Sequence, residues 1–455
     1  MSHHRRLSAD SSAFAGSSAS RRDFSRRDFL RRSAAAGFKA TVGLSIGLSI
    51  ARSAHAAGDE VLRVGLVGCG GRGTGAARDA LVADKNAQLV ALSDAFADRM
   101  QSCLKGLQKN EAIADRVKVT PETCFAGFDG YKQLIASGVD VVLLATPPHF
   151  RPMHLKACVE AGKHVFCEKP MAVDAPGVRS ILESAQLARQ KKLSLVSGFC
   201  WRYHSGVRET MQRVLDGAIG EILAIQETYN TGTLWQRPRQ PDWTEMEFQM
   251  RNWYYFTWLS GDHNVEQHVH SLDKALWAMR DQPPARAWGL GGRQVRTAPQ
   301  FGNIYDHHAV VYEYPNGTRV YSFTRQMANC YNEVSDIFHG TKGRADILKH
   351  TIEGQTSWKY SGPPCDMYRA EHEALFRSIR EGRGHNDGVW MAYSTMMAIL
   401  GRMVTYTGQM LTWEQALNSQ EKLSPERYAF HAQPPIVPQA DGNYPVAMPG
   451  LTKFV

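Results

Sequence analysis

The 455-residue sequence lacks a long apolar run and lacks closely spaced cysteines. Its one weak apolar stretch near the N-terminus, residues 40–51, is only 12 residues long. A helix that crosses a bilayer needs ~20 such residues, so we expect no stable membrane span. None of the eight cysteines stands in a CxxC pair, and a cysteine metal site is therefore not expected.

An excess of positive charge is also missing from most of the chain. Residues 1–56 carry ten basic and three acidic side chains, a net +7 of the chain's +9, so the remainder is close to neutral at +2. Nucleic-acid binding needs a concentrated basic surface on the folded domain. The charge pattern therefore excludes a nucleic-acid partner. With 43% apolar and 21% charged residues, the composition is that of an ordinary globular protein.

Residues 1–56 have the features of a targeting segment. The run Ser25-Arg26-Arg27-Asp28-Phe29-Leu30-Arg31 is followed by the weak apolar stretch and then by Ala54-His55-Ala56, a small-x-small cleavage pattern. This order resembles a twin-arginine export signal; a disordered basic tail is the alternative. Cleavage would leave 399 residues starting at Ala57.

The resemblance to an export signal implies the twin-arginine machinery as a partner and a periplasmic or otherwise exported location. Proteins on this route fold before export, often with a cofactor bound. Buried thiols then stay reduced, so we expect no structural disulfide.

The first half of the mature chain alternates short apolar runs with helical patterns, as a parallel α/β sheet does. Several of the runs are almost wholly apolar, which is typical of strands buried on both faces. The runs expected as strands are 61–67, 88–93, 139–145, 164–167 and 193–198. The helices expected between them are 74–83, 152–161 and 176–191. The pattern predicts an α/β protein with a doubly wound, Rossmann-type domain over residues 57–199.

After residue 200 the pattern changes to longer alternating segments. The strands expected here are 221–228, 285–295, 309–314, 318–325 and 334–339, and the helices are 265–280, 368–380 and 389–407. Asn316-Gly317 predicts a hairpin turn, because both residues tolerate positive φ. We expect an α+β substrate domain with a mostly antiparallel open sheet over residues 200–422. Residues 423–455 contain six prolines and no periodicity, which indicates a tail that wraps the surface.

A glycine-rich loop, Gly68-Cys69-Gly70-Gly71-Arg72-Gly73, follows the first expected strand and opens the first helix. Its glycines permit a tight turn, close approach of a pyrophosphate and close helix–strand packing, and the helix N-terminus offers unpaired N–H groups to phosphates. Asp94 lies 21 residues beyond Gly73, where a carboxylate can bind the adenosine ribose hydroxyls and repel a 2′-phosphate. An ordinary glycine turn with a solvated aspartate is the alternative. We predict NAD rather than NADP, held by Gly68, Gly70, Gly71, Arg72, Gly73 and Asp94.

Two further motifs carry a family resemblance. Ala145-Thr146-Pro147-Pro148-His149 follows the third expected strand, and Gly162-Lys163-His164-Val165-Phe166-Cys167-Glu168-Lys169-Pro170 contains a Glu-Lys-Pro tripeptide. Together they resemble the glucose–fructose oxidoreductase / inositol dehydrogenase / MocA family over nearly the whole mature chain. The resemblance implies an NAD(P)-dependent oxidoreductase acting on CH–OH groups. It also implies cofactor contacts from Thr146, Pro147, His149, Glu168 and Lys169.

The family commonly places an Asp-x-x-x-His motif in the substrate domain. The matching stretch here gives Glu266 and His270, with glutamate in place of aspartate and with Asp273 close by. Spacing i, i+4 puts both side chains on one face of a helix. The resemblance implies that this face meets the nicotinamide ring, with Lys169 arriving from the nucleotide domain.

These three residues form the expected catalytic group. We expect His270 to be the base, since the pKa of histidine lies near neutrality. Lys169 would stabilise the developing alkoxide, and Glu266 would orient the imidazole or offset the lysine charge. A solvent-facing lysine and a structural histidine are the alternative.

Polar and aromatic residues of the second half are candidates for substrate binding. They are Arg202, Tyr203, Trp235, Tyr255 and Asn303, although such residues also fill cores. His263, Glu266 and His270 share a possible metal-binding face. Because no other ligand cluster points to it, we predict no metal.

Three functions remain open from the sequence. An exported dehydrogenase has no dependable pool of nicotinamide, so its cofactor must stay bound and be recycled in place. We expect an oxidoreductase acting on a sugar or sugar-derived polyol. The first alternative is a redox-neutral glycoside hydrolase that oxidises, eliminates, hydrates and reduces its substrate. The second is a catalytically silent sugar-binding protein. Family members often pair through the open face of the second sheet, so a homo-oligomer is also expected.

Overall fold

The structure is a computed structural model that describes residues 60–455. The export signal predicted for residues 1–56 lies outside these residues. Among the described helices, none combines the length and the apolarity needed to cross a membrane. All eight cysteines are present as free thiols.

The first domain is built on a six-stranded sheet in which every pairing is parallel. The strand order, β3-β2-β1-β4-β5-β6, is that of a Rossmann fold, which confirms the predicted fold class. The strands are β1 (Leu62–Val67), β2 (Ala87–Asp94), β3 (Cys124–Ala126), β4 (Val141–Leu144), β5 (His164–Cys167) and β6 (Leu195–Ser197). All four residues of β4 are buried, as expected for an apolar run at the centre of a parallel sheet.

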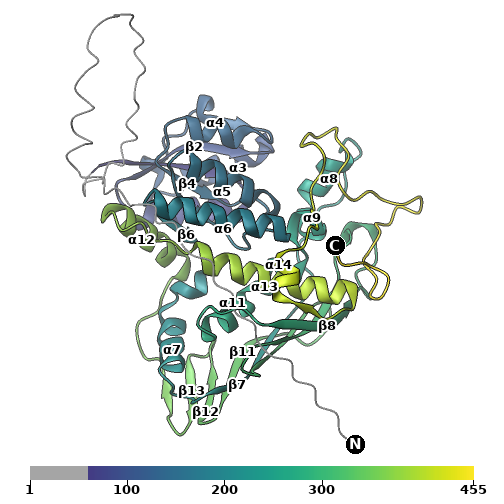
Figure 1. Cartoon of the computed structure of the whole chain (residues 1–455). Coiled ribbons are helices and arrows are strands. Elements are labelled where there is room, and N and C mark those ends of the chain that lie inside the picture. The colour runs from purple at the N-terminus through teal and green to yellow at the C-terminus, as the bar shows by residue number, and fades with distance from the viewer. Residues whose placement is uncertain (1–59) are drawn as a thin grey trace, which may run out of the picture. The chain divides into compact units, whose positions relative to one another are not determined.

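Helices cover both faces of this sheet (Figure 1). They are α2 (Gly71–Ala83), α3 (Ala97–Gln108), α4 (Gly130–Ala136), α5 (Arg151–Glu160) and α6 (Ala175–Gln190). The three helices predicted from the sequence correspond to α2, α5 and α6. Strand β3 and helices α3 and α4 were not predicted. Strand β3 and helix α4 have only three and seven residues, too few to establish a period.

The second domain contains a nine-stranded sheet with the order β14-β13-β12-β11-β7-β10-β9-β8-β15. Only β7 and β10 pair in parallel, so the sheet is mostly antiparallel as predicted. The strands are β7 (Ile222–Thr231), β8 (Arg286–Gly292), β9 (His307–Glu313), β10 (Arg319–Gln326), β11 (Glu333–Gly340), β12 (Gly343–Asp346), β13 (Thr351–Gly354), β14 (Trp358–Lys359) and β15 (Leu411–Thr412). The predicted hairpin at Asn316-Gly317 is present between β9 and β10, with Gly317 at φ 86°.

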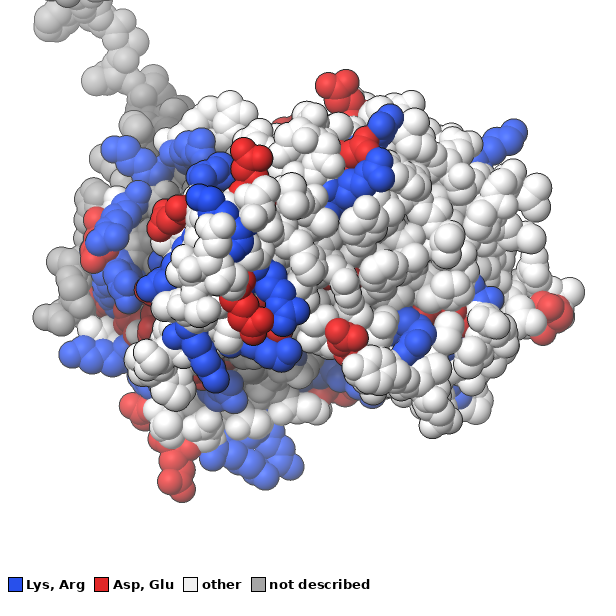
Figure 2. Space-filling view, turned by 90° about the horizontal axis from the view of Figure 1, so that it is seen from below, with Lys and Arg blue, Asp and Glu red and all other residues white. Residues whose placement is uncertain are grey.

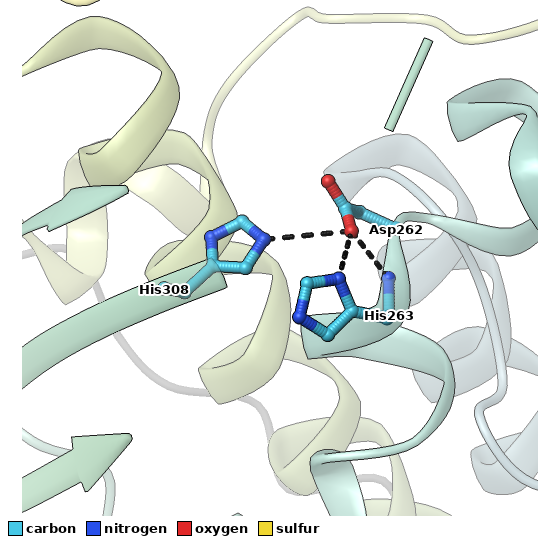
Figure 3. Close-up of side chains that lie close together, drawn as sticks. All are labelled: Asp262, His263 and His308. Carbon is cyan, nitrogen blue, oxygen red and sulfur yellow. Dashed lines mark hydrogen bonds and ion pairs between the residues drawn. The ribbon is translucent and has the colours of Figure 1, made fainter. Parts of the chain in front are cut away.

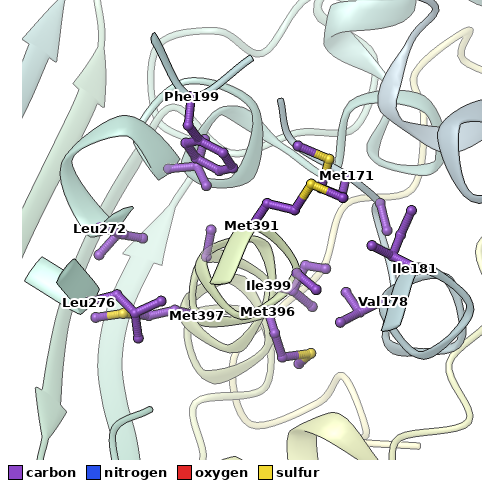
Figure 4. Close-up of a cluster of buried hydrophobic side chains, with 14 of the residues drawn as sticks. Met171, Val178, Ile181, Phe199, Leu272, Leu276, Met391, Met396, Met397 and Ile399 are labelled. Carbon is purple, nitrogen blue, oxygen red and sulfur yellow. The ribbon is translucent and has the colours of Figure 1, made fainter. Parts of the chain in front are cut away.

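The helices of the second half are α7 (Ser205–Leu215), α8 (Glu245–Arg251), α9 (Thr257–Ser260), α10 (His263–Glu266), α11 (Val269–Ala278), α12 (Met367–Arg380), α13 (Gly388–Thr407) and α14 (Trp413–Leu417). Several of them lie on one face of this sheet or between the domains, whereas α8 lies away from the sheet, beside the tail (Figure 1). Helix α13 is buried at 17 of its 20 positions, which is typical of a helix surrounded by protein on all sides. Figure 4 shows its methionines and Ile399 packed among side chains of α6 and α11. One apolar core therefore joins the two domains.

The single helix predicted over residues 265–280 is wrong. The chain forms α10 and α11, separated by a turn at Gln267 and His268. In this turn the His268 N–H bonds the carbonyl of His263, five residues back, so the α-helical ladder is interrupted. Glu266 ends one helix and His270 lies in the first turn of the next, and they do not share a continuous helix face.

Two segments from the end of the chain pack against the first domain. Helix α12 contributes Leu375, Phe376 and Ile379 to the apolar cluster around β1. The tail after residue 422 contains no helix or strand. Its Tyr428 and Phe430 rings pack against Phe128 in tilted arrangements, at 6.0 and 5.0 Å between ring centroids. Both segments therefore pack against a domain that is distant from them in the sequence.

The face of the molecule seen in Figure 2 carries basic and acidic side chains interspersed, most of them toward one side. It is not a continuous surface of one charge.

Candidate active site

A cavity of about 520 Å³ lies at the carboxyl ends of the first sheet and reaches the second domain. Ligands of open α/β sheets bind at this edge. Most of the predicted site residues line it: Gly68, Gly70, Gly71, Arg72, Gly73, Asp94, Thr146, Pro147, Glu168, Lys169, Trp235, Glu266 and His270. The fold therefore brings together residues that are up to 202 positions apart in the chain.

The glycine loop has the geometry that a pyrophosphate requires. Gly68 has φ 99°, and a Cβ on Gly73 would lie 1.8 Å from the Gly68 carbonyl oxygen, so neither position accepts a side chain. Gly70 and Gly71 line the cavity, and a Cβ there would meet no protein atom within 4 Å. Gly71 also begins α2. The loop thus leaves open backbone at a helix N-terminus, which fits the phosphates of a dinucleotide.

Asp94 closes the adenosine side of this loop. Its carboxylate accepts hydrogen bonds from the N–H groups of Cys69 at 2.7 Å and Phe96 at 2.9 Å. Burial raises the pKa of Asp94 from its usual value, although both N–H groups oppose the shift. The two bonds fix the carboxylate at the cavity wall, where it can accept hydrogen bonds from ribose hydroxyls.

Lys169 and Glu266 meet across the boundary between the two domains. The Lys169 Nζ lies 2.9 Å from Glu266 Oε1 and 2.5 Å from the Glu266 carbonyl oxygen. The two side chains retain only 14% and 15% of their exposure. Glu266 is the last residue of α10. The pair is a charged hydrogen bond in a largely water-excluded site.

His270 lines the same cavity, one helix further on. Burial lowers its pKa well below the usual value, and the cations of Lys169 and Lys274 lower it further. The pKa is therefore not near neutrality as predicted, and the imidazole is neutral throughout the physiological range. Its Nδ1 is buried and has no hydrogen-bond partner in residues 60–455. A neutral ring is still able to accept a proton.

The side chain of Arg72 turns from the glycine loop towards the Glu-Lys-Pro strand. Its Nε lies 2.8 Å from Glu168 Oε1, and its guanidinium stacks over the Tyr368 ring at 4.6 Å. Glu371, 3.9 Å away, has a pKa raised well above its usual value by burial and by Glu168. Tyr368 and Glu371 belong to α12, so this helix completes the wall of the cavity.

His149, predicted at the cofactor, does not line the cavity. Its Nε2 lies 2.8 Å from the Tyr428 hydroxyl, and its ring meets Trp258 edge-on at 5.0 Å. Burial lowers its pKa to about 3. His149 is therefore a neutral side chain that packs between the first domain and the tail.

Arg202, predicted at the substrate, is buried away from the cavity. It donates to both carboxylate oxygens of Asp273 at 2.9–3.1 Å and to Asp281 at 2.7 Å. Its guanidinium lies between the rings of Trp390 at 4.1 Å and Trp277 at 4.9 Å. These contacts engage the Nε and Nη2 nitrogens of Arg202, and they pair Asp273 with this arginine rather than with the candidate catalytic group.

The other predicted substrate residues divide between the cavity and the core. Trp235 lines the cavity and is 44% exposed. Tyr203 instead donates its hydroxyl to Asp387, and Asn303 accepts the Thr257 N–H at 3.0 Å. Tyr255 donates to a backbone carbonyl. Asn303 and Tyr255 are buried and Tyr203 is half-buried, so all three take part in packing, a common role of aromatic and amide side chains.

A second buried cluster lies just before α10 (Figure 3). Asp262 accepts from the Nδ1 of His263 at 2.8 Å and lies 3.4 Å from the Nε2 of His308, while its other oxygen accepts from the Tyr305 N–H and the Tyr406 hydroxyl. Burial would raise the pKa of Asp262, but the two histidines lower it well below its usual value. The three side chains could offer metal ligands within 4.8 Å of one another. Since hydrogen bonds already satisfy both carboxylate oxygens, we interpret the cluster as an anchor for the start of α10.

Several cavity residues were not predicted from the sequence. They are mainly aromatic and basic side chains: Phe96, Arg99, Phe128, Tyr131, Phe150, Arg151, His154, Arg237, Met250, Arg251, Trp253 and Tyr368. Arg99 stands five residues after Asp94, a spacing that could have suggested it. Arg237, Arg251 and Trp253 belong to the second domain, and no local pattern brings them to a nucleotide-binding edge.

Comparison with known proteins agrees with this architecture. Residues 62–199 match the family described as "Oxidoreductase family, NAD-binding Rossmann fold", and residues 207–346 match the "GFO/IDH/MocA C-terminal domain". The chain is 30% identical to inositol 2-dehydrogenase of Klebsiella pneumoniae over 74% of this chain and 91% of that one. It is 26% identical to 2,7-anhydro-N-acetylneuraminate hydratase of Escherichia coli over 46% of this chain, which spans about half (51%) of that relative.

Among solved structures, scyllo-inositol dehydrogenase of Lactobacillus casei with bound NAD(H) and scyllo-inositol matches with a TM-score of 0.60. Sequence identity to it is 18%, over 78% of this chain and 100% of that one. This likeness supports the fold. With both domains matched and the cavity built at the expected edge, the chain belongs to the Gfo/Idh/MocA oxidoreductase family and is an NAD-binding enzyme.

Proposed function

We propose that this enzyme oxidises a secondary hydroxyl of a sugar or sugar-derived polyol and keeps its NAD bound between half-reactions. The observation that carries the proposal is the meeting of Lys169, Glu266 and His270 at one wall of the cavity that the glycine loop also lines. Bound NAD supplies the hydride acceptor and, in the return step, the hydride donor. The inositol dehydrogenase relatives favour a polyhydroxylated ring as the substrate class.

The chain's own residues handle the proton of the reacting hydroxyl. The neutral His270 accepts that proton as the carbon loses hydride, so the hydroxyl becomes a carbonyl. The Lys169 ammonium stabilises the oxygen as negative charge develops on it, in a site that excludes most water. Glu266, whose Oε1 lies 2.9 Å from the Lys169 Nζ, holds the ammonium in place and offsets its charge. On return, His270 gives the proton to the oxygen of a second carbonyl compound.

Retention of the cofactor follows from the proposed export. An enzyme outside the cytoplasm has no dependable pool of nicotinamide, so release of the reduced form would end catalysis after one turnover. A second substrate that is reduced in the same site restores the starting state.

A redox-neutral variant of the chemistry is the second candidate. Oxidation of a sugar acidifies the neighbouring carbon, so a glycosidic bond can be eliminated, water added and the carbonyl reduced again. The relative named as a hydratase of an anhydro-sugar favours this candidate, since its name describes addition of water. Turnover of a nitrophenyl glycoside without added NAD would support it.

The experiment that tests the proposal compares the wild-type protein with Lys169→Ala. Inositols, aldoses and glycosides are added to protein with bound nucleotide, and absorbance of reduced nicotinamide is followed. The proposal expects a signal with at least one sugar or polyol and its loss in Lys169→Ala. If Lys169→Ala retained the full biological activity of the protein, a sugar-binding role without catalysis would be favoured instead.

A further inference from the structure

Part of the nucleotide cavity is supplied by the second domain. Residues 232–253, here called the strap, leave β7, cross to the edge of the first domain and return through α8. Five strap residues line the cavity together with the glycine loop and Asp94: Trp235, Arg237, Met250, Arg251 and Trp253. The strap therefore lies on the adenosine side, because Asp94 marks the ribose position.

Polar contacts fasten the strap to the helix that follows Asp94. Arg251 donates to the two carboxylate oxygens of Asp98 at 3.1 and 3.2 Å. Its guanidinium also lies 4.0 Å from the centre of the Phe96 ring and 5.1 Å from that of Trp243. A bidentate ion pair combined with stacking is a strong and directional contact for arginine.

An apolar cluster reinforces this attachment and includes the tail. It joins side chains of the first domain, of the strap and of the following helices, and of residues 423–455. Its buried members are Phe96, Phe150, Met246, Phe248, Met250, Phe256, Trp258, Leu259 and Tyr444, with Leu423, Tyr428, Phe430 and Ile436 packed against them. The tail also bonds the strap directly, since Gln249 donates to the Ile436 carbonyl at 2.7 Å and Tyr444 donates to Glu245 at 2.6 Å.

Two arginines at this place have no anionic partner in the described residues. The side chains of Arg99 and Arg237 make no ion pair or hydrogen bond within residues 60–455. Both line the cavity, and both also line an adjoining hollow with Gly71 and Thr74 at the start of α2. The pKa of Arg237 is lowered by partial burial and by the nearby cations of Arg99 and Arg251. Asp94 and Asp98 act on these arginines electrostatically from nearby, but neither forms an ion pair with them. Arginines that stand without an ion pair beside a phosphate-binding loop point to an anionic ligand.

We infer that the strap and the tail form a clasp over the adenosine half of the cavity, in which Arg237 and Arg99 bind the diphosphate of NAD and slow its release. The nucleotide then dissociates only when the Arg251–Asp98 contact and the apolar cluster around Phe96 separate. This inference deepens the proposed retention of the cofactor, but it needs only that the protein binds NAD.

Nucleotide release in the absence of any sugar tests the clasp. Full-length protein is loaded with NADH and mixed with a large excess of NAD, and the decay of the bound-NADH fluorescence gives the dissociation rate. Arg237→Ala is compared with Arg237→Lys, which keeps the charge, and with Arg344→Ala. Arg344 carries the same charge, but it forms an exposed pair with Glu353 on strands β12 and β13, away from the strap, the tail and the cavity.

Arg237→Ala removes a charge-assisted contact to a phosphate, so we expect it to release NADH at least about tenfold faster than the wild-type protein. Arg237→Lys should release NADH at an intermediate rate, and Arg344→Ala at a rate within about twofold of wild type. Equal rates in Arg237→Ala and Arg344→Ala would overturn the inference. So would fast release from the wild-type protein, even if that protein oxidised sugars.

Titration of nucleotide-free protein identifies the phosphate that Arg237 contacts. Arg237→Ala should weaken the binding of NAD and of NADP to the same degree, because the two nucleotides share the diphosphate. A loss confined to NADP would overturn the assignment, since only the 2′-phosphate would then be involved. If no sugar were oxidised under any condition, the proposed function would fail while these binding measurements would stand.

Discussion

Three alanine substitutions in the glycine loop and α2 separate the packing of the loop from its contact with the nucleotide. Gly73, Gly71 and Gly75 lie within five positions on one helix but have different surroundings. A Cβ added at Gly73 would lie 1.8 Å from the Gly68 carbonyl oxygen. A Cβ at Gly71 would have no atom within 4 Å, and a Cβ at Gly75 would have an Arg72 nitrogen as its nearest atom, at 3.9 Å.

The magnitude for Gly73→Ala follows from how little room the loop has to move. An ordinary contact begins at 3.4 Å, so the carbonyl and the helix would have to separate by about 1.6 Å. Gly68 cannot retreat, because its own Cα already approaches the Ala145–Thr146 backbone, where a Cβ would lie at 2.6 Å. Overpacking of this kind costs about 1–3 kcal/mol or more. Because the displaced loop carries the phosphate site, NAD affinity should fall at least about tenfold.

The two other variants are expected to behave differently. Gly71→Ala places a methyl group in the open cavity, so it should weaken NAD binding without a loss of stability. Gly75→Ala should leave NAD binding unchanged and raise the free energy of unfolding by about 1 kcal/mol, the helix-propensity difference between the two residues.

The assay is urea unfolding of nucleotide-free protein together with calorimetric titration of NAD. If Gly73→Ala and Gly75→Ala gave the same stability and the same affinity, the loop would not have the geometry described here, and the assignment of the cofactor site would be refuted.

Three further predictions concern pH and assembly. First, burial and Lys169 lower the pKa of His270, so this base stays neutral as the pH falls through 6.5. The acidic limb of the kcat/KM profile should therefore lie below pH 6.5. A limb centred near 6.5 would contradict the assignment of His270 as the base. Second, His149 and His154 have pKa values lowered to about 3 and His263 to about 4, against about 6.5 in the unfolded chain. The free energy of unfolding should therefore be at its full value above pH 6.5 and should decrease below it, by up to about 1.4 kcal/mol per pH unit for each histidine. A thermal midpoint that is constant between pH 7 and pH 5 would contradict the burial of these histidines. Third, the register of β8, β9 and β10 puts the exposed Leu290 and Phe323 on the open face of the second sheet. If two copies pair through this face, Phe323→Asp should lower the mass measured by light scattering to that of a monomer. A wild-type protein that is already a monomer would exclude this pairing.

Much of the nucleotide domain is predictable from the sequence because its determinants are local. Strand β5 has the predicted bounds, and a glycine loop between a buried strand and a helix can be recognised without knowledge of the rest of the chain. The same holds for the hairpin at Asn316-Gly317, where two adjacent residues determine the turn. Lys169 and Glu266 were named from motifs, and the structure places them in contact.

What the sequence did not reveal depends on contacts between distant segments. Arg202 looks like a substrate ligand until two tryptophans and two carboxylates surround it. The break between α10 and α11 contains no glycine or proline that would predict it, and it is visible only in the backbone bond from His268 to His263. The strap reaches the adenosine side only because the two domains are docked, and no periodicity within residues 232–253 encodes that position.

The most direct test of the proposed function is an optical measurement on purified protein. Denaturation should release NAD that co-purified with the chain, and addition of a suitable sugar or polyol to the native protein should produce reduced-nicotinamide absorbance that persists until a second carbonyl compound is added. Lys169→Ala, compared at an equal amount of bound nucleotide, should show no such signal. A protein without bound nucleotide, or an undiminished signal in Lys169→Ala, would contradict the proposed chemistry.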